Sequence, residues 1–290
     1  MADNGYSSTG ILGNEHFQAL VLIFFSALAI VLAISKTARF YCKYWIFNST
    51  FGILGIIVLP VLMLSPGDSS NARWAGILTR MTVKHIYGIK LKICGWENLK
   101  EERPFIIVCN HQSSVDNIGM MEVIPENTVC MMKKSLKYAG PFGLAAILCG
   151  TIFVDRSNPE KAKQALEDTV QIILKEKVNL WMFPEGHRNM MKQREDHMLP
   201  FKKGAFNIAV KAQVPIVPIV LSSQEPFFSF SQRRFTKGLQ SIEILPPIPT
   251  KGLTVEDVPD LAENVRLKMI DTFVRISPNL SHGNSAFVKG

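Results

Sequence analysis

Cysteine is scarce in this sequence, and no two cysteines stand at the spacing of a redox or zinc motif. The chain has 290 residues, and its five cysteines include no C-x-x-C pair. Three of the five lie within apolar runs, so we expect buried free thiols in a reducing compartment and no metal site. The five are Cys42, Cys94, Cys109, Cys130 and Cys149.

The sequence also lacks the features of a nucleic-acid-binding protein. It contains no zinc finger, no RRM core and no arginine-rich arm. Lys and Arg outnumber Asp and Glu by 32 to 24, which gives a net charge of +8. Because these basic residues are scattered through apolar sequence, the surplus favours anionic membranes or phosphate-bearing ligands as partners, and not nucleic acid.

Charge is absent between Phe17 and Ser35. A helix of this segment spans about 29 Å at ~1.5 Å per residue, which is enough to cross the hydrocarbon core of a bilayer. The preceding tail, residues 1–16, contains Asp3 and Glu15 but no Lys or Arg, the reverse of a signal peptide's basic start. We therefore expect a retained transmembrane helix.

A second apolar run, Ile46 to Ser65, has basic residues on both sides. These are Lys36, Arg39 and Lys43 before it, and Arg73, Arg80 and Lys84 after it. The positive-inside rule places both flanks in the cytosol and the amino terminus outside. Polar residues, glycines and Pro60 interrupt the run. We therefore expect a broken helix that enters one leaflet and returns, with a full second span as the alternative, so that residues 17–66 form a membrane anchor.

Beyond residue 72 short apolar runs alternate with helical patterns, which is typical of an α/β domain. The runs are FIIVC (105–109), TVCMM (128–132), TIFV (151–154), NLWMF (179–183), PIVPIV (215–220) and SIEIL (241–245). A helix is predicted to start after Asn158 as N-cap, with Pro159 in its first position. Another is predicted from about Val255 to Ile276. One domain over residues 73–276 and a tail over 277–290 are expected.

His111 and Asp116 follow the first of these strands, in the run NHQSSVD. The carboxyl ends of strands in an open α/β sheet are where ligands bind, and a histidine there can accept a proton near neutral pH. The two side chains can meet only if the residues between them turn back, and Asp116 would then orient the imidazole of a general base. Helix capping by Asp116, Ser113 or Ser114, with His111 as a turn residue, would account for the same sequence equally well.

Charged residues end two more strands and precede a helix, which suggests a phosphorylated substrate. An arginine fork can clasp a phosphate, and Glu185 could orient an arginine or a substrate hydroxyl. Two lysines before a helix amino terminus also favour anions, although a solvated surface pair is the plainer interpretation of Lys133 and Lys134. The candidate binding residues are Arg156, Glu185, Gly186, Arg188, Lys202, Lys203 and Lys133.

Four ordered motifs carry a resemblance to a known family. NHQSSVD resembles the Asn-His-x-x-x-x-Asp signature of the glycerophospholipid acyltransferases, and GTIFVDR, FPEGHRN and VPIVPIV resemble that family's second, third and fourth motifs. The resemblance covers residues from about 85 to 250. NHQSSVDNIGMMEV, LPFKKGAF and QVPIVPIV look most like the animal 1-acyl-sn-glycerol-3-phosphate acyltransferases of the endoplasmic reticulum.

The resemblance implies a mixed sheet flanked by helices and a membrane-bound enzyme whose catalytic domain faces the cytosol. His111 would be the general base with Asp116 as its partner, while Arg156, Glu185 and Arg188 would bind the phosphate and glycerol of the acceptor. The substrates would be acyl-CoA and lysophosphatidic acid, with no cofactor and no metal. His187 stands where the family usually has threonine, so acceptor preference or pH dependence is open.

Two other classes of function stay open at this point. A serine hydrolase could use Ser113 or Ser114 with His111, but the sequence lacks the G-x-S-x-G elbow. A non-catalytic lipid-binding protein could retain the fold without turnover, although the intact His111 and Asp116 argue against it. Among the transferases, glycerol-3-phosphate or another lysophospholipid is the alternative acceptor.

Overall fold

A seven-stranded mixed sheet forms the centre of the chain in a computed structural model, which describes residues 9–100, 104–155, 157–189, 197–278 and 280. The strand order is β1-β9-β6-β2-β5-β3-β4, and every neighbouring pair is parallel except β6 and β9. The strands are β1 (Ile89–Cys94), β2 (Ile106–Cys109), β3 (Thr128–Lys133), β4 (Ile152–Val154), β5 (Asn179–Met182), β6 (Ile216–Leu221) and β9 (Gly238–Ile244). Strands β7 (Phe228–Ser229) and β8 (Arg234–Phe235) form a separate hairpin.

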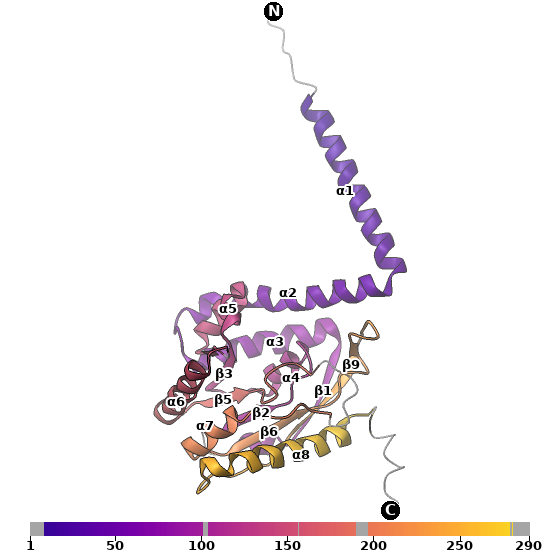
Figure 1. The fold of residues 1–290 in the computed structure, drawn as a ribbon. Helices are drawn as coiled ribbons and strands as arrows, with labels where there is room; N and C mark the ends of the chain where they lie inside the picture. The colour runs from indigo at the N-terminus through magenta and orange to yellow at the C-terminus, as the bar shows by residue number, and fades with distance from the viewer. Residues whose placement is uncertain (1–8, 101–103, 156, 190–196, 279, 281–290) are drawn as a thin grey trace, which may run out of the picture.

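Helices cover both faces of this sheet, as Figure 1 shows. One face carries α3 (Ala72–Tyr87) and α4 (Asp116–Val123), and the other carries α6 (Pro159–Glu176), α7 (Gly204–Ala212) and α8 (Val258–Ile276). The central strand β2 serves both cores. Ile106 and Val108 pack in the cluster that includes α6, α7 and α8, whereas Ile107 packs with Met120 and Val123 of α4. The predicted α/β architecture with a mixed sheet is therefore confirmed.

Each of the six apolar runs forms a strand, within a few residues of the expected bounds. The helix predicted after Asn158 also begins there, because the Asn158 side chain accepts a hydrogen bond from the N–H of Lys161 at 3.0 Å. Strand β1 was not predicted. Its sequence IKLKIC alternates polar and apolar residues, as suits a strand at the sheet edge, and so it lacks the continuous apolar run of the buried strands.

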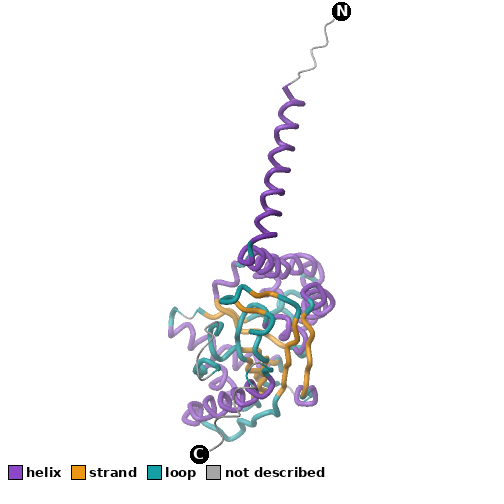
Figure 2. Tube along the Cα trace, turned by 90° about the vertical axis from the view of Figure 1, so that its right-hand side faces the viewer, coloured by secondary structure: helices purple, strands orange, loops and turns teal. Residues whose placement is uncertain are grey.

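Two long apolar helices precede the sheet domain. They are α1 (Thr9–Ile34) and α2 (Lys36–Leu62), and both are long and apolar enough to cross a membrane by length and composition. In Figures 1 and 2, α1 leads away from the rest of the protein, whereas α2 lies along the surface of the domain beside α3 and α5 (Gly140–Leu148). The window from His16 to Ile34 has no buried residue.

The expectation that the second apolar run is broken was wrong, since α2 is one continuous helix through Ile46 to Leu62. Its polar residues do not interrupt it. Asn48 and Thr50 donate side-chain hydrogen bonds to the carbonyls of Tyr44 and Ile46, one turn earlier, at 2.7 and 2.9 Å. The basic residues expected in a connecting stretch lie instead within the first turns of this helix.

Glycine lets α2 approach α5 closely. A Cβ atom on Gly55 would lie 3.3 Å from the carbonyl oxygen of Pro141, in the first turn of α5. The far end of α2 is fixed by the buried side chain of Asn71, which donates to the carbonyls of Leu62, Ser65 and Leu148. The second apolar segment is therefore packed into the domain, and does not only anchor it.

Candidate active site

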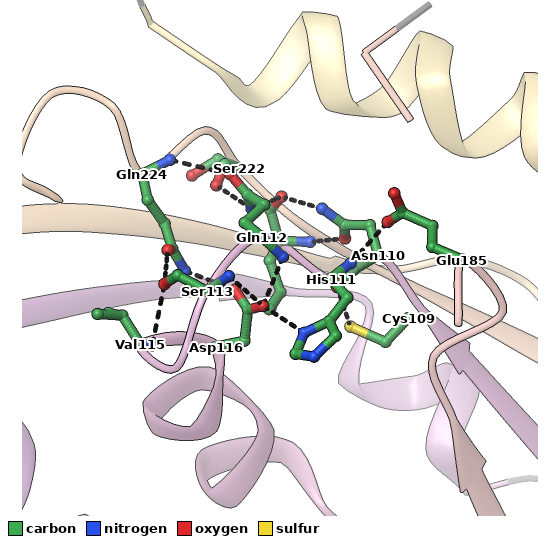
Figure 3. Close-up of polar contacts among 11 residues, drawn as sticks. Cys109, Asn110, His111, Gln112, Ser113, Val115, Asp116, Glu185, Ser222 and Gln224 are labelled. Carbon is green, nitrogen blue, oxygen red and sulfur yellow. Dashed lines mark hydrogen bonds and ion pairs between the residues drawn. The ribbon is translucent and has the colours of Figure 1, made fainter. Parts of the chain in front are cut away.

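The turn between β2 and α4 brings His111 and Asp116 into contact (Figure 3). His111 Nδ1 lies 2.8 Å from Asp116 Oδ2, and the Asp116 side chain is fully buried while the imidazole is 18% exposed. The sequence left open whether these residues meet or only cap a helix. The structure shows that they meet, and at the same turn Ser113 Oγ accepts from the N–H of Val115, at the N-cap position of α4.

Four hydrogen-bond donors surround the Asp116 carboxylate. Oδ2 accepts from His111 Nδ1 and from the backbone N–H groups of Gln112 and Ser113 at 2.6 and 2.9 Å. Oδ1 accepts from the side chain of Gln224 at 2.6 Å. A buried charge is tolerated where donors satisfy it in this way, so Asp116 is held as a fixed acceptor behind the imidazole.

The turn itself is fastened to the end of the neighbouring strand β6. Asn110 Nδ2 donates to the carbonyl of Leu221 at 3.0 Å, and Asn110 Oδ1 accepts from the N–H of Leu221 at 2.8 Å. Gln112 Nε2 adds bonds to the carbonyls of Leu221 and Ser222. These contacts join two adjacent parallel strands at their carboxyl ends, where the sequence predicted a site.

Glu185, after β5, supports the same turn from the other side. It is 1% exposed, and its two oxygens accept from the N–H groups of His111 at 2.7 Å and Leu199 at 3.0 Å. Burial raises the pKa of this carboxyl to about 7, against the opposing effect of the two N–H donors. Glu185 was expected to orient an arginine or a substrate hydroxyl. Both of its oxygens instead hold the backbone, because the carboxylate points into the protein.

The loop after β5 also contacts His111 directly. The ring of Phe183 stacks on the imidazole with centroids 4.1 Å apart, and the N–H of Asn189 donates to the carbonyl of His111 at 2.7 Å. The adjacent Arg188 and His187 have exposed side chains. The chain beside Arg188 thus contacts the backbone of His111.

Lys202 packs against the same loop. Its N–H donates to the carbonyl of Pro184 at 2.8 Å, and a Cβ atom on Gly186 would lie 2.7 Å from Lys202 Cε. Gly186 has a φ of +78°, a conformation that suits glycine, so glycine here permits both the turn and the lysine beside it. The exposed Lys203 follows at the start of α7.

The other two predicted binding residues are placed differently. Lys133 is exposed at the end of β3, and β5 separates that strand from β2. Lys133 lies at the same edge of the sheet as His111, but farther along that edge. Arg156 lies outside the described residues.

Comparison with known proteins gives the family of this chain. The sequence model of the family named Acyltransferase matches residues 90–222. Over 255 residues the chain is 39% identical to 1-acyl-sn-glycerol-3-phosphate acyltransferase alpha from Homo sapiens, with 88% of each chain covered. The 1-acyl-sn-glycerol-3-phosphate acyltransferase of Saccharomyces cerevisiae is 36% identical over 78% of this chain and 73% of its own. This chain belongs to the 1-acyl-sn-glycerol-3-phosphate acyltransferase family.

A solved structure has the same fold as this acyltransferase. It is the crystal structure of the 1-acyl-sn-glycerophosphate (LPA) acyltransferase PlsC from Thermotoga maritima, with a TM-score of 0.61 and 24% identity. The match covers 82% of this chain and 94% of that one. The resemblance that the four motifs carried is therefore confirmed in both family and fold.

The serine side chains of the acyltransferase's turn are not arranged as nucleophiles. Ser113 Oγ donates to Gln224 Oε1 at 2.5 Å and accepts from the N–H of Val115 at 3.0 Å. Ser114 Oγ is buried and has no hydrogen-bond partner among the described residues. Neither serine oxygen is hydrogen-bonded to His111, as a serine nucleophile would be to its base, so the geometry favours a histidine base over a serine hydrolase.

The cysteines are free thiols, as predicted. Burial raises the pKa of Cys130 to about 12 and that of Cys149 to about 11, and the pKa of Cys109 is raised well above its ordinary value. Burial therefore disfavours the thiolate, the reactive form, at all three. Cys94 differs from the expectation because it ends the edge strand β1 and is exposed. Within the described residues no three His, Cys, Asp or Glu side chains gather as a metal site would require.

Sequence reasoning missed two residues of this site, Gln112 and Gln224. The Gln112 side chain reaches from the turn to the end of β6, and the Gln224 side chain reaches from the segment after β6 to Asp116. The signal that could have found Gln224 is its place three residues beyond a fully buried parallel strand, since polar residues at such strand ends line the ligand edge of a sheet.

Proposed function

We propose that this acyltransferase transfers an acyl group from acyl-CoA to the sn-2 hydroxyl of 1-acyl-sn-glycerol 3-phosphate, which gives phosphatidic acid and CoA. Its relatives carry the name of that activity. The observation that carries the proposal is the contact between His111 Nδ1 and the buried, fully bonded Asp116. It supplies a fixed base at the edge of the sheet formed by the adjacent strands β6, β2 and β5, which carry three of the four motifs.

The tautomer of the base follows from its partner. Asp116 Oδ2 also receives two backbone N–H groups, so it acts as an acceptor and the proton lies on His111 Nδ1. The lone pair of the neutral ring is therefore on Nε2. A base held in this way contributes typically ~10²–10⁴ in rate.

The reaction is direct acyl transfer. His111 Nε2 takes the proton of the sn-2 hydroxyl as that oxygen attacks the thioester carbonyl of acyl-CoA. The tetrahedral intermediate then expels the CoA sulfur, the C–S bond breaks, and the imidazolium returns its proton to the leaving thiolate. Asp116 stabilises the imidazolium between these two steps.

Basic residues around the histidine would bind the phosphate groups. Arg188 and Lys202 have the best support, because Glu185 and Asn189, on either side of Arg188, bond to the backbone of His111, and Lys202 bonds to the backbone of Pro184. Arg156, Lys203 and Lys133 are assigned to the same role by motif and by position at the sheet edge. Gly186 would shape the loop that carries Arg188.

The protein would act in the endoplasmic reticulum membrane with the catalytic domain in the cytosol. Exposed apolar side chains run along α1, and α2 presents Trp45, Ile46, Ile53 and Ile57 away from the domain. Lys36, Arg39 and Lys43 lie just after α1, on the side that the positive-inside rule assigns to the cytosol. This arrangement would leave the lysolipid tail in the bilayer while its headgroup reaches the site.

The test is release of free thiol from oleoyl-CoA by the detergent-purified chain, with lysophosphatidic acid, glycerol-3-phosphate or lysophosphatidylcholine as acceptor. We expect release with lysophosphatidic acid alone, and at least ~10²-fold less with His111→Ala. Preference for another acceptor would overturn the substrate assignment. Turnover that survives His111→Ala would overturn the mechanism.

A further inference from the structure

Gln224 makes a contact with the histidine's partner that the proposed mechanism does not use. Its side chain is buried, and its Nε2 donates to Asp116 Oδ1 at 2.6 Å (Figure 3). The other carboxylate oxygen, Oδ2, faces His111 and two backbone N–H groups. Gln224 is thus the side chain that engages Asp116 from the side opposite to the imidazole.

The orientation of the Gln224 amide is determined by a second hydrogen bond. Ser113 Oγ accepts from the N–H of Val115, so its own proton is available to Gln224 Oε1, 2.5 Å away. Because the amide oxygen receives that proton, the amide NH₂ group must face Asp116. Val115, Ser113, Gln224 and Asp116 therefore form one directional chain of donors and acceptors.

The backbone of Gln224 is fixed by the same turn. Its N–H donates to Gln112 Oε1 at 3.1 Å, and Gln112 Nε2 in turn donates to the carbonyls of Leu221 and Ser222. Two glutamines, one on each segment, thus hold the turn after β2 and the segment after β6 together. The carbonyl of Gln224 also accepts from the N–H groups of Phe227 and Phe228, at 3.0 and 2.7 Å, so the backbone of Gln224 is held on both sides.

We propose that Gln224 is a positioning residue for acyl transfer, whose carboxamide holds the Asp116 carboxylate in the rotation that aligns the other oxygen with His111. The terminal torsion of an aspartate is soft, so donors on both oxygens are needed to fix it. A neutral amide supplies the donor without adding charge to the buried pair. This inference rests on the proposed function, in which His111 is the base.

The charged and titratable surroundings of the pair make a pH profile informative. His111 and Asp116 belong to the turn and α4, and Cys109 ends β2 with a pKa well above its ordinary range. Glu185, after β5, has a pKa of about 7, and Arg266 of α8 stabilises its charged form. Gln224 is the group from the β6 side, and it does not titrate. A titratable side chain at position 224 would therefore add a new limb to the pH profile of kcat.

Gln224→Leu removes both side-chain hydrogen bonds and keeps similar bulk. We expect kcat to fall on the order of 10- to 100-fold, the effect of losing a hydrogen bond to a charged group, while KM for both substrates changes less than about twofold. Because the Gln224 side chain is buried and bonds to Ser113 and Asp116, a residue that acts through Asp116 should change kcat and leave KM nearly unchanged.

Gln224→Glu gives the sharper readout. In its protonated form the new carboxyl group can donate to Asp116 Oδ1 and accept from Ser113, as the amide does. Burial next to Asp116 raises the pKa of such a group, so it stays protonated at mildly acidic pH. We expect kcat close to that of the unsubstituted chain at low pH, and a progressive loss as pH rises and the two carboxylates repel each other.

Thr250→Val is the matched control. Thr250 is buried, and its Oγ1 donates to the carbonyls of Ala209 and Val214, near the start of β6 and so at the opposite end of that strand from the site. This variant loses buried hydrogen bonds without touching the turn. We expect a lower melting temperature with an unchanged pH profile and kcat.

The experiment measures kcat and KM from pH 5.5 to 9, and the melting temperature, for the unsubstituted chain, His111→Ala, Thr250→Val and both Gln224 variants. The new alkaline limb of Gln224→Glu, with a kcat loss in Gln224→Leu beyond that of Thr250→Val, supports the inference. Unchanged pH profiles in both Gln224 variants, or a rise in KM without loss of kcat, would overturn the role of Gln224. If transfer by the unsubstituted chain still depended on His111, the proposed function would stand. Absence of His111-dependent transfer by the unsubstituted chain would overturn both.

Discussion

At the scale of single residues, two carboxylates hold other groups of the candidate active site in place. Asp116 holds the imidazole of His111, and Glu185 holds the main chain of the same turn. Both are buried, and both were chosen from the sequence because they lie in polar segments that directly follow apolar strands. The sequence did not show that these two side chains are buried and point away from the solvent.

Glu185 gives the protein a stability that depends on pH. Its pKa in the folded state is about 7, above the ordinary 4.5, so the folded state binds more protons than the unfolded state between those values. The free energy of unfolding therefore falls as pH rises through this window, by roughly 3 kcal/mol. Glu185→Gln removes the titration, so thermal melting of this variant should change less between pH 4.5 and 7 than melting of the unsubstituted chain. Parallel melting curves for the two proteins would contradict the assigned cause.

The same residues show how far the sequence could predict this site. His111 and Asp116 are five positions apart, so a local turn was enough to suggest their contact. Gln224 lies 108 positions from Asp116, and their contact depends on the register of β6 against β2, which pairs Cys109 with Ile219. Sequence patterns identify strands but do not give the register of strands distant in the chain, so this contact could not be predicted.

At the scale of elements, the predictions succeeded where a segment's own pattern decides its structure. The buried parallel strands are short apolar runs, and α6 has a capping residue and a first-position proline. The prediction failed for α2, where polar residues and glycines suggested a break. The side chains of Asn48 and Thr50 donate hydrogen bonds to carbonyls of the same helix, and Gly55 allows close packing against α5. Composition alone cannot separate a glycine that breaks a helix from one that packs it.

The packing of α2 can be tested with two glycines of the same helix. A Cβ atom at Gly55 would lie 3.3 Å from the Pro141 carbonyl oxygen, whereas one at Gly52 would have nothing within 4 Å. We expect Gly55→Val to destabilise the protein by ~1–3 kcal/mol through overpacking against α5. Gly52→Val is the control and should change the melting temperature little. Equal effects of the two substitutions would show that α2 does not pack on α5 as described.

At the scale of the whole molecule, the two apolar helices have different relations to the catalytic domain. The window from His16 to Ile34 is entirely unburied, while 28% of the corresponding window of α2 is buried. Figure 1 shows α2 lying over α3 and α5 and α1 pointing away. The fold of the catalytic domain therefore includes α2, which the sequence grouped with α1 as anchor.

Labelling of one cysteine can show on which side of the membrane the catalytic domain lies. Cys94 is free and exposed at the end of β1, whereas Cys109 is fully buried. In sealed microsomes, with cytosolic faces outward, a membrane-impermeant maleimide should label the chain, and Cys94→Ser should remove most of that label. Labelling that requires permeabilised membranes would place the domain in the lumen and contradict the proposed orientation.

Removal of α1 tests the independence of the domain. A chain that starts at Ser35 keeps α2 and its contacts with α3 and α5. We expect it to fold and to retain His111-dependent transfer in detergent, but to be extracted from membranes at alkaline pH, because a helix on the surface binds less firmly than one that spans. Loss of activity in detergent would show that α1 supports the catalytic domain directly.

The exposure of α1 also affects how the enzyme is distributed among membranes. The window from His16 to Ile34 is unburied, so a bilayer around it would constrain it by thickness, and hydrophobic mismatch costs fractions of a kcal/mol per Å. Lengthening or shortening α1 would therefore move the enzyme between thinner and thicker membranes without altering a catalytic contact. We therefore expect membrane preference to be set by a stretch of the chain that is separate from the contacts of the site.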